Sequence, residues 1–130
     1  MKEERPFYED DAVDMIRQKM GEASPNWVRK IMRKMKLQRI TRVSIERMIA
    51  CLAIHNFGLP ITTRLLAAVF DREEEAGMAT FLHTLGDKGC LLMKRGVGGR
   101  RYEWIVSPVF WRYFTEGWEE EQQSKLKWEI

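Results

Sequence analysis

The sequence has few of the residues on which metal sites and disulfide frameworks depend. It contains two cysteines and two histidines in 130 residues. Cys51 and Cys90 are far apart in the chain, and neither has a second cysteine or a histidine at the spacing of a metal site. Both lie among apolar residues, so we expect buried, reduced thiols, with a structural disulfide as the alternative. We expect no metal and no cofactor.

Long hydrophobic runs are also missing. No stretch approaches the roughly 18 uncharged apolar residues that a membrane-spanning helix needs, and the first residues, MKEERPFYEDD, are mostly charged. We therefore expect no membrane partner, no export and a cytoplasmic protein. With 45% hydrophobic and 32% charged residues, we expect the chain to fold as one domain around its own core.

A catalytic constellation is absent from the sequence as well. His55 and His83 have no nucleophile or metal ligand at a recognisable spacing. Ser24, Ser44 and Ser107 stand at expected helix starts, where a hydroxyl caps the helix instead of attacking a substrate. The glycine-rich stretch GVGG does not lead from a strand into a helix, as a phosphate-binding loop does. We therefore expect that the protein is not an enzyme.

Positive charge is concentrated in two segments, although the net charge of the chain is only +3. Residues 27–42, WVRKIMRKMKLQRITR, contain seven cations and no anion, and residues 94–101, KRGVGGRR, contain four more cations. Acidic residues gather elsewhere, at 9–11, 73–75 and 119–121. Basic segments of this kind indicate nucleic-acid binding. The alternative is a solvated helix face and a solvated turn.

The spacing of apolar residues, caps and breakers predicts a mainly α-helical chain with one small β-hairpin. The predicted helices cover residues 10–20, 25–36, 44–56, 62 or 63 to 70, 71 to 85, and 108 to about 124. The predicted strands cover residues 90–95 and 101–106, on either side of the glycine-rich turn. Asp71 and Glu74 stand at capping-box spacing before the fifth helix, and Gly86 is expected to end that helix.

Residues 44–106 resemble the winged helix-turn-helix superfamily of DNA-binding domains. The matching stretches are SIERMIACLAIHNFG for the first helix, LPITTRLLAAVFD for a small strand and the second helix, REEEAGMATFLHTLGDKG for the third helix, and CLLMKRGVGGRRYEWIV for the hairpin, or wing. The length of the chain favours a single domain over residues 1–130, and the resemblance covers about half of it. This domain divides into an N-terminal arm with helices at 1–43, a winged helix-turn-helix core at 44–106 and a C-terminal helix at 107–130.

The resemblance implies that the protein binds double-stranded DNA, as a transcription regulator or as a nucleoid-associated or replication-associated factor. A duplex is densely negative, so cations on a rigid frame are its natural contacts. The candidate DNA-binding residues lie on the wing, on the basic helix and near the helix-turn-helix: Lys94, Arg95, Arg100 and Arg101; Arg29, Lys30, Arg33 and Lys34; and Thr63, Arg64, Thr80 and Lys88.

The third helix of this core departs from the superfamily pattern, because it begins with the acidic run REEE at residues 72–75. Its carboxylates would repel phosphate, although one glutamate could read cytosine. Two interpretations follow. The wing and the basic helix bind DNA with little sequence preference, or the module is a protein-protein interaction domain that docks on a replication, transcription or partition partner.

Aromatic residues form a stripe at helical spacing near the C-terminus, at Trp111, Phe114 and Trp118. The flanking helices are similar in arrangement to those by which multiple-antibiotic-resistance and arsenic-resistance type regulators dimerise. We therefore expect the stripe to form a homodimer interface. The alternatives are packing into the domain's own core and, less in keeping with the rest of the pattern, stacking of single-stranded bases.

Overall fold

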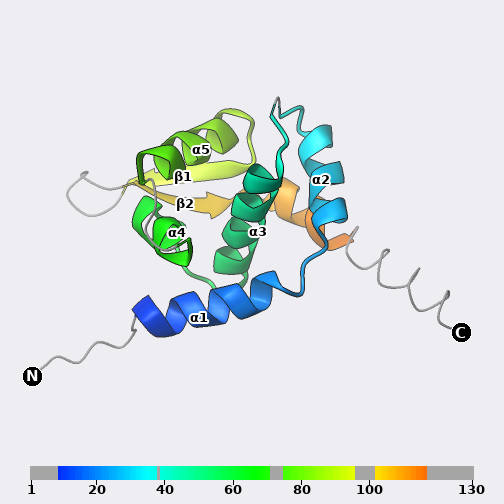
Figure 1. Ribbon diagram of the computed structural model, residues 1–130. Coiled ribbons are helices and arrows are strands. Elements are labelled where there is room, and N and C mark those ends of the chain that lie inside the picture. Colours follow the sequence, from blue (N-terminus) through cyan, green and yellow to red (C-terminus); the bar gives the residue numbers. More distant parts are fainter. Residues whose placement is uncertain (1–8, 38, 71–74, 96–101, 117–130) are drawn as a thin grey trace, which may run out of the picture.

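The computed structural model describes residues 9–37, 39–70, 75–95 and 102–116 (Figure 1). Its elements follow the order α1 (Glu9–Met20), α2 (Pro25–Lys34), α3 (Arg42–Asn56), α4 (Thr63–Val69), α5 (Glu75–Asp87), β1 (Leu91–Arg95) and β2 (Tyr102–Val106). A further helix begins at residue 108 and reaches residue 116, and we name it the C-terminal helix. The predicted mainly helical chain with a two-stranded hairpin is therefore confirmed.

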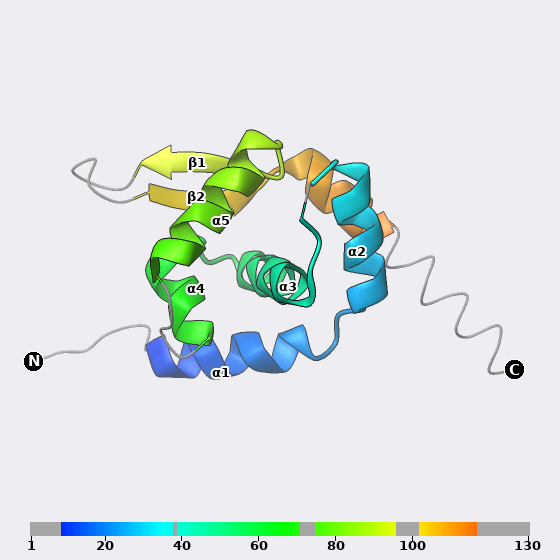
Figure 2. The same cartoon turned by 45° about the horizontal axis from the view of Figure 1, so that its top comes forward.

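Helix α3 is the centre of the fold. Viewed nearly along its axis in Figure 2, it is surrounded by α1, α2, α4 and α5, the two strands and the C-terminal helix. Its buried residues lie on every side of the helix: Ile45, Met48, Ile49, Ala50, Cys51, Leu52, Ala53 and Ile54. A helix that is apolar all round has to be covered all round. Apolar residues at helical spacing predict one apolar stripe on residues 44–56, but the structure buries α3 on every side.

Helix α2 begins where the sequence predicted. The Ser24 hydroxyl accepts a hydrogen bond from the backbone N–H of Trp27 at 3.2 Å, and Pro25 takes the first helical position. The helix ends at Lys34, two residues earlier than predicted. Lys36 adopts a φ of 60°, a left-handed conformation that an α-helix cannot include.

The predicted start of α3 at Ser44 is wrong by two residues. Thr41 is the N-cap, and its hydroxyl accepts the N–H of Ser44 at 3.1 Å. Ser44 returns the interaction, because its hydroxyl accepts the N–H of Thr41 at 2.8 Å. This is a reciprocal capping box with serine in the third helical position. Arg42 and Val43 consequently belong to the helix.

The predicted end of α5 at Gly86 is also wrong. The helix continues through Asp87, and the chain turns at Gly89, whose φ is 80°. Gly86 is needed for packing: a Cβ there would lie 2.5 Å from Cζ3 of Trp104. The glycine lets the indole of β2 lie against the helix. The predicted capping by Asp71 and Glu74 lies outside the described residues.

The two strands pair antiparallel, in a register that runs from Leu91 opposite Val106 to Arg95 opposite Tyr102. Ile61, between α3 and α4, forms an isolated bridge to Trp104 with two N–H···O bonds of 2.8 Å. Since β1 occupies one edge of β2, Ile61 occupies the other. On the face of β2 that carries Tyr102, Trp104 and Val106, the last two are buried and Tyr102 is exposed.

Two long-range contacts fix the outer helices around α3. In α1, the Arg17 guanidinium donates to the carbonyl oxygen of Val69 at 3.0 Å and so joins α1 to the end of α4. In α2, Nε1 of Trp27 donates to the carbonyl oxygen of Phe114 at 3.1 Å and joins α2 to the C-terminal helix. None of the described helices is long and apolar enough to span a bilayer.

Candidate nucleic-acid interface

Helix α2 carries the strongest charge asymmetry in the described part of the chain. Val28, Ile31 and Met32 are buried against the core. The opposite side presents four exposed cations, which together we name the basic face of α2: Arg29, Lys30, Arg33 and Lys34. All four were predicted as DNA-binding residues, and the structure brings them to one solvent-exposed helix face.

No carboxylate in the described part of the chain pairs with the basic face of α2. Within the described residues, none of the four cations forms an ion pair. Lys30 lies with its Nζ 5.9 Å from the centre of the Trp27 ring, and Lys34 has the same distance to the Tyr113 ring. These distances suit weak cation–π contacts, which leave the ammonium groups in water. Lys34 and Arg33 also lie in the last turn of α2, where positive charge complements the helix dipole.

A second basic surface is a groove of about 740 Å³ between the α2–α3 connection, the first turns of α3, and α5. We name it the α3–α5 groove. Its polar lining combines three cations and four hydroxyl groups with one carboxylate: Arg39, Arg47, Lys88, Thr41, Ser44, Thr80, Thr84 and Asp87. An excess of positive charge in a concave surface concentrates anions there.

The sequence prediction named Thr80 and Lys88 for DNA contact, and the structure places both in this groove. It missed Arg47, whose guanidinium carbon lies 5.9 Å from the centre of the Phe81 ring of α5. Arg39, a member of the basic segment at residues 27–42, also lines the groove. Arg47 has no sequence signal of its own, because its place in the groove depends on how α5 packs relative to α3.

The hydroxyl groups of the two threonines of α5 in the groove donate hydrogen bonds to backbone carbonyl groups of the same helix. Thr80 donates through Oγ1 to the carbonyl oxygen of Ala76 at 3.2 Å, and Thr84 donates to that of Thr80 at 3.0 Å. Both side chains are exposed. In this arrangement their oxygen atoms face outward as hydrogen-bond acceptors.

The remaining predicted DNA contacts fall on α4 and on the hairpin. Thr63 is the half-buried first residue of α4, and Arg64 follows it with an exposed side chain. Lys94 and Arg95 end β1, with backbone pairing to Glu103 and Tyr102. Arg100 and Arg101 lie outside the described residues, so the predicted contact of the wing with DNA stays a prediction.

The predicted dimer residues Trp111 and Phe114 contact their own chain. Both are half-buried against the hydrophobic core, with ring centres 5.6 Å apart. The Trp111 ring also meets the His55 ring edge to face at 4.7 Å. Trp118 lies outside the described residues. The dimer interface itself stays a prediction.

The two histidines and two cysteines are packed against neighbouring side chains of the protein. Burial lowers the pKa of His55 below its ordinary value, and His83 packs edge to face on Trp104 at 5.1 Å. Burial raises the pKa of Cys90 to about 11, and burial together with the neighbouring Cys90 raises that of Cys51 further. Such thiols are poor nucleophiles at neutral pH. In the described ranges, no three His, Cys, Asp or Glu side chains lie close enough to hold a metal ion.

No protein family, no curated protein and no solved structure matches this chain.

Proposed function

We propose that this protein binds double-stranded DNA through the basic face of α2, with the α3–α5 groove as a second contact. The observation that carries the proposal is the set of four exposed cations on one helix face, none of them in an ion pair with a described residue. Lysine and arginine neutralise phosphates and release condensed counterions, which is the main source of affinity for a duplex. A rigid helix that displays them at successive turns matches an extended phosphate backbone.

The order of elements supports a winged helix-turn-helix assignment within this proposal. Helix α3 is followed by the short edge segment at Ile61, then by α4, α5 and the β1–β2 hairpin. In a winged helix-turn-helix the second and third helices form the helix-turn-helix and the hairpin forms the wing. By that assignment, α5 is the helix that approaches the major groove.

The outward-facing acceptors of α5 suit this helix to reading bases. Thr80 and Thr84 use their hydroxyl hydrogens within α5, so their oxygens are free to accept hydrogen bonds. Cytosine and adenine present amino donors in the major groove. Arg39, Arg47 and Lys88 supply the positive charge in the same groove. We propose that the basic residues supply affinity and that the threonines supply modest base preference.

A matched pair of double variants tests the proposal. Arg29→Gln with Arg33→Gln removes two charges from the basic face. The control, Lys19→Gln with Arg112→Gln, removes two charges that pair with Glu22 at 3.1 Å and with Glu116 at 3.8 Å. Both variants change the net charge equally. A difference in their DNA affinity therefore results from contact with DNA and not from the overall charge of the protein.

We expect the basic-face variant to bind a labelled duplex about tenfold more weakly than the wild type, and the control to change affinity by less than about threefold. The measurement is fluorescence anisotropy at about 100 mM salt, an ionic strength at which distant charges are screened. Equal affinities of the two variants would remove the basic face of α2 from the interface.

The second candidate function is a protein-interaction module. Three large apolar residues of the hairpin are exposed, namely Leu92 at 46%, Met93 at 48% and Tyr102 at 42%. Met93 and Tyr102 share one face of the two-stranded sheet and Leu92 lies on the other, and exposed apolar side chains of this kind fit contacts with a protein partner. This candidate predicts association that survives high salt, which phosphate binding does not.

The proposal includes a homodimer associated with the nucleoid, as expected for DNA-binding regulators of this type. On the described C-terminal helix, Val109 and Tyr113 are exposed at 64% and 50% and lie one turn apart. They are apolar side chains that a second copy could cover. Sedimentation equilibrium checks this part: we expect twice the chain mass, and a single-chain mass at high concentration would contradict it.

A further inference from the structure

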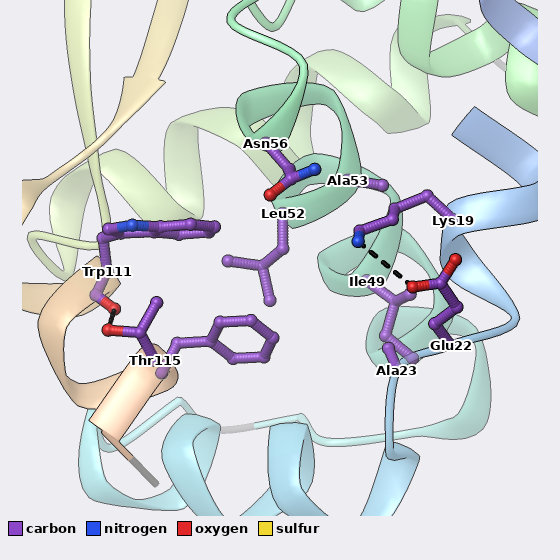
Figure 3. A pocket seen from close by; sticks show the side chains of 10 residues that line it. Lys19, Glu22, Ala23, Ile49, Leu52, Ala53, Asn56, Trp111 and Thr115 are labelled. Atoms are coloured by element: carbon purple, nitrogen blue, oxygen red, sulfur yellow. Dashed lines mark hydrogen bonds and ion pairs between the residues drawn. The ribbon is translucent and has the colours of Figure 1, made fainter. Parts of the chain in front are cut away.

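Beside the second half of α3 lies an apolar pocket of about 210 Å³, shown in Figure 3. We name it the Trp111 pocket. Its apolar walls are the side chains of Ile49, Leu52, Ala53, Trp111 and Phe114. The residues come from three places in the chain, namely the end of α1 with its following turn, α3 and the C-terminal helix. The pocket is separate from the basic face of α2 and from the α3–α5 groove.

The polar groups around the pocket are almost all satisfied within the protein. Lys19 pairs with Glu22 at 3.1 Å, so the two charged groups cancel. The Thr115 hydroxyl donates to the carbonyl oxygen of Trp111 at 3.0 Å. Asn56, at the end of α3, is different: its side chain forms no hydrogen bond with a described residue. Figure 3 shows it between Trp111 and Lys19.

We propose that the Trp111 pocket binds a small, uncharged aromatic molecule of two fused rings with one hydrogen-bond donor. A cavity of roughly 150 Å³ holds one benzene ring, so about 210 Å³ suits a second, fused ring. Trp111 and Phe114 form a tilted pair with an interplanar angle of 33°, a wall against which an aromatic ring packs well. The cancelled charges favour a neutral molecule, and Oδ1 of Asn56 accepts its donor.

The choice of a small molecule over a macromolecule follows from the size and chemistry of the pocket. Binding pockets for small molecules are concave and mainly apolar, with few polar groups that fix orientation. Here one exposed amide, without a hydrogen bond to any described residue, stands beside apolar walls, and the volume is far below that of a groove that seats a helix or strand.

The probe for the first test is indole, whose ring N–H can donate to Asn56, with indene as the equivalent hydrocarbon. We expect the full-length protein to bind indole saturably with a Kd of roughly 0.1–1 mM, measured by isothermal titration calorimetry and ligand-observed NMR. Indene should bind about three- to tenfold more weakly, because it lacks the donor. Absence of saturable indole binding by the folded protein would overturn the proposal.

Three variants locate the binding. Ala23→Phe, at a half-buried position in the lining, fills the pocket and should weaken indole binding at least about tenfold. Asn56→Ala, at an exposed position, should abolish the difference between indole and indene. Asn26→Ala, an exposed asparagine outside the lining, is the matched control and should bind like the wild type. Circular dichroism confirms that each variant is folded, and indole binding that persists in Ala23→Phe would overturn the location.

Discussion

At position 86, the absence of a side chain determines how α5 meets the sheet. Replacing Gly86 with alanine would place a methyl group 2.5 Å from Cζ3 and 2.9 Å from Cη2 of Trp104. Alanine gains about 1 kcal/mol of helix propensity over glycine. Trp104 is buried and bonded to Ile61 through two backbone hydrogen bonds, so its ring has little room to retreat.

We therefore expect Gly86→Ala to lower the free energy of unfolding by about 1–3 kcal/mol in urea denaturation. The control is Gly21→Ala, where the nearest atom to the new Cβ is 3.4 Å away. That change should stay within about 0.5 kcal/mol of the wild type. Equal stability of the two variants would contradict the close packing of α5 against Trp104.

His55 gives the stability of the protein a dependence on pH. Burial lowers the pKa of His55 in the folded state below its ordinary value of 6.5. The unfolded chain therefore binds more protons between the two pKa values, and the free energy of unfolding falls as the pH drops below about 6.5. We expect His55→Gln to lose this component of the acid sensitivity. Denaturant titrations at several pH values between 5 and 7.5 measure it, and identical pH profiles for the two proteins would contradict the burial of His55.

The roles of some residues follow from their neighbours in the sequence, whereas the roles of others depend on distant parts of the chain. Ser24 and Ser107 cap their helices as predicted, because a serine before a proline is a strong local signal. Ser44 and Gly86 were misassigned, because Thr41 competes as a cap and Trp104 competes for the space beside Gly86. The second of these depends on a residue far along the chain, which periodicity does not reveal.

At the scale of elements, the contact between α2 and the C-terminal helix holds the basic face in place. Trp27 is half-buried, and its Nε1 donates to the Phe114 carbonyl at 3.1 Å. Trp27→Phe keeps an aromatic ring and removes the donor. We expect the free energy of unfolding to fall by about 0.5–1.5 kcal/mol in denaturant titrations.

The control for this prediction is Tyr113→Phe, an exposed ring on the partner helix. It should leave the stability nearly unchanged. An equally small effect of Trp27→Phe would mean that the hydrogen bond between α2 and the C-terminal helix contributes nothing in solution.

The elements themselves followed from the sequence more closely than their assembly did. The buried and exposed faces of α2 were predictable, because Val28, Ile31 and Met32 recur at helical spacing and the cations occupy the other positions. The α3–α5 groove was not, because Arg47 and Thr84 come from helices whose relative placement is a tertiary property. The same reason hides the Trp111 pocket, whose lining comes from the end of α1 with its following turn, from α3 and from the C-terminal helix.

At the scale of the whole molecule, the central α3 explains how basic surface and apolar pocket coexist in a small protein. In Figure 2, α1 lies below α3, α2 lies on its right, α4 and α5 lie on its left, and the strands and the C-terminal helix lie above it. The basic face of α2 points away from this core, since the buried side of α2 contacts it. The groove and the pocket lie where neighbouring elements meet over α3.

The most direct test of DNA binding is the salt dependence of the wild-type protein on a labelled duplex of about 20 base pairs, between about 50 and 200 mM salt. If each cation of the basic face neutralises one phosphate, the logarithm of the association constant falls with the logarithm of salt concentration with a slope of roughly −3 to −4. Added contacts in the α3–α5 groove would steepen it. A slope near zero, or no binding at the lowest salt, would contradict DNA binding and favour the protein-interaction module.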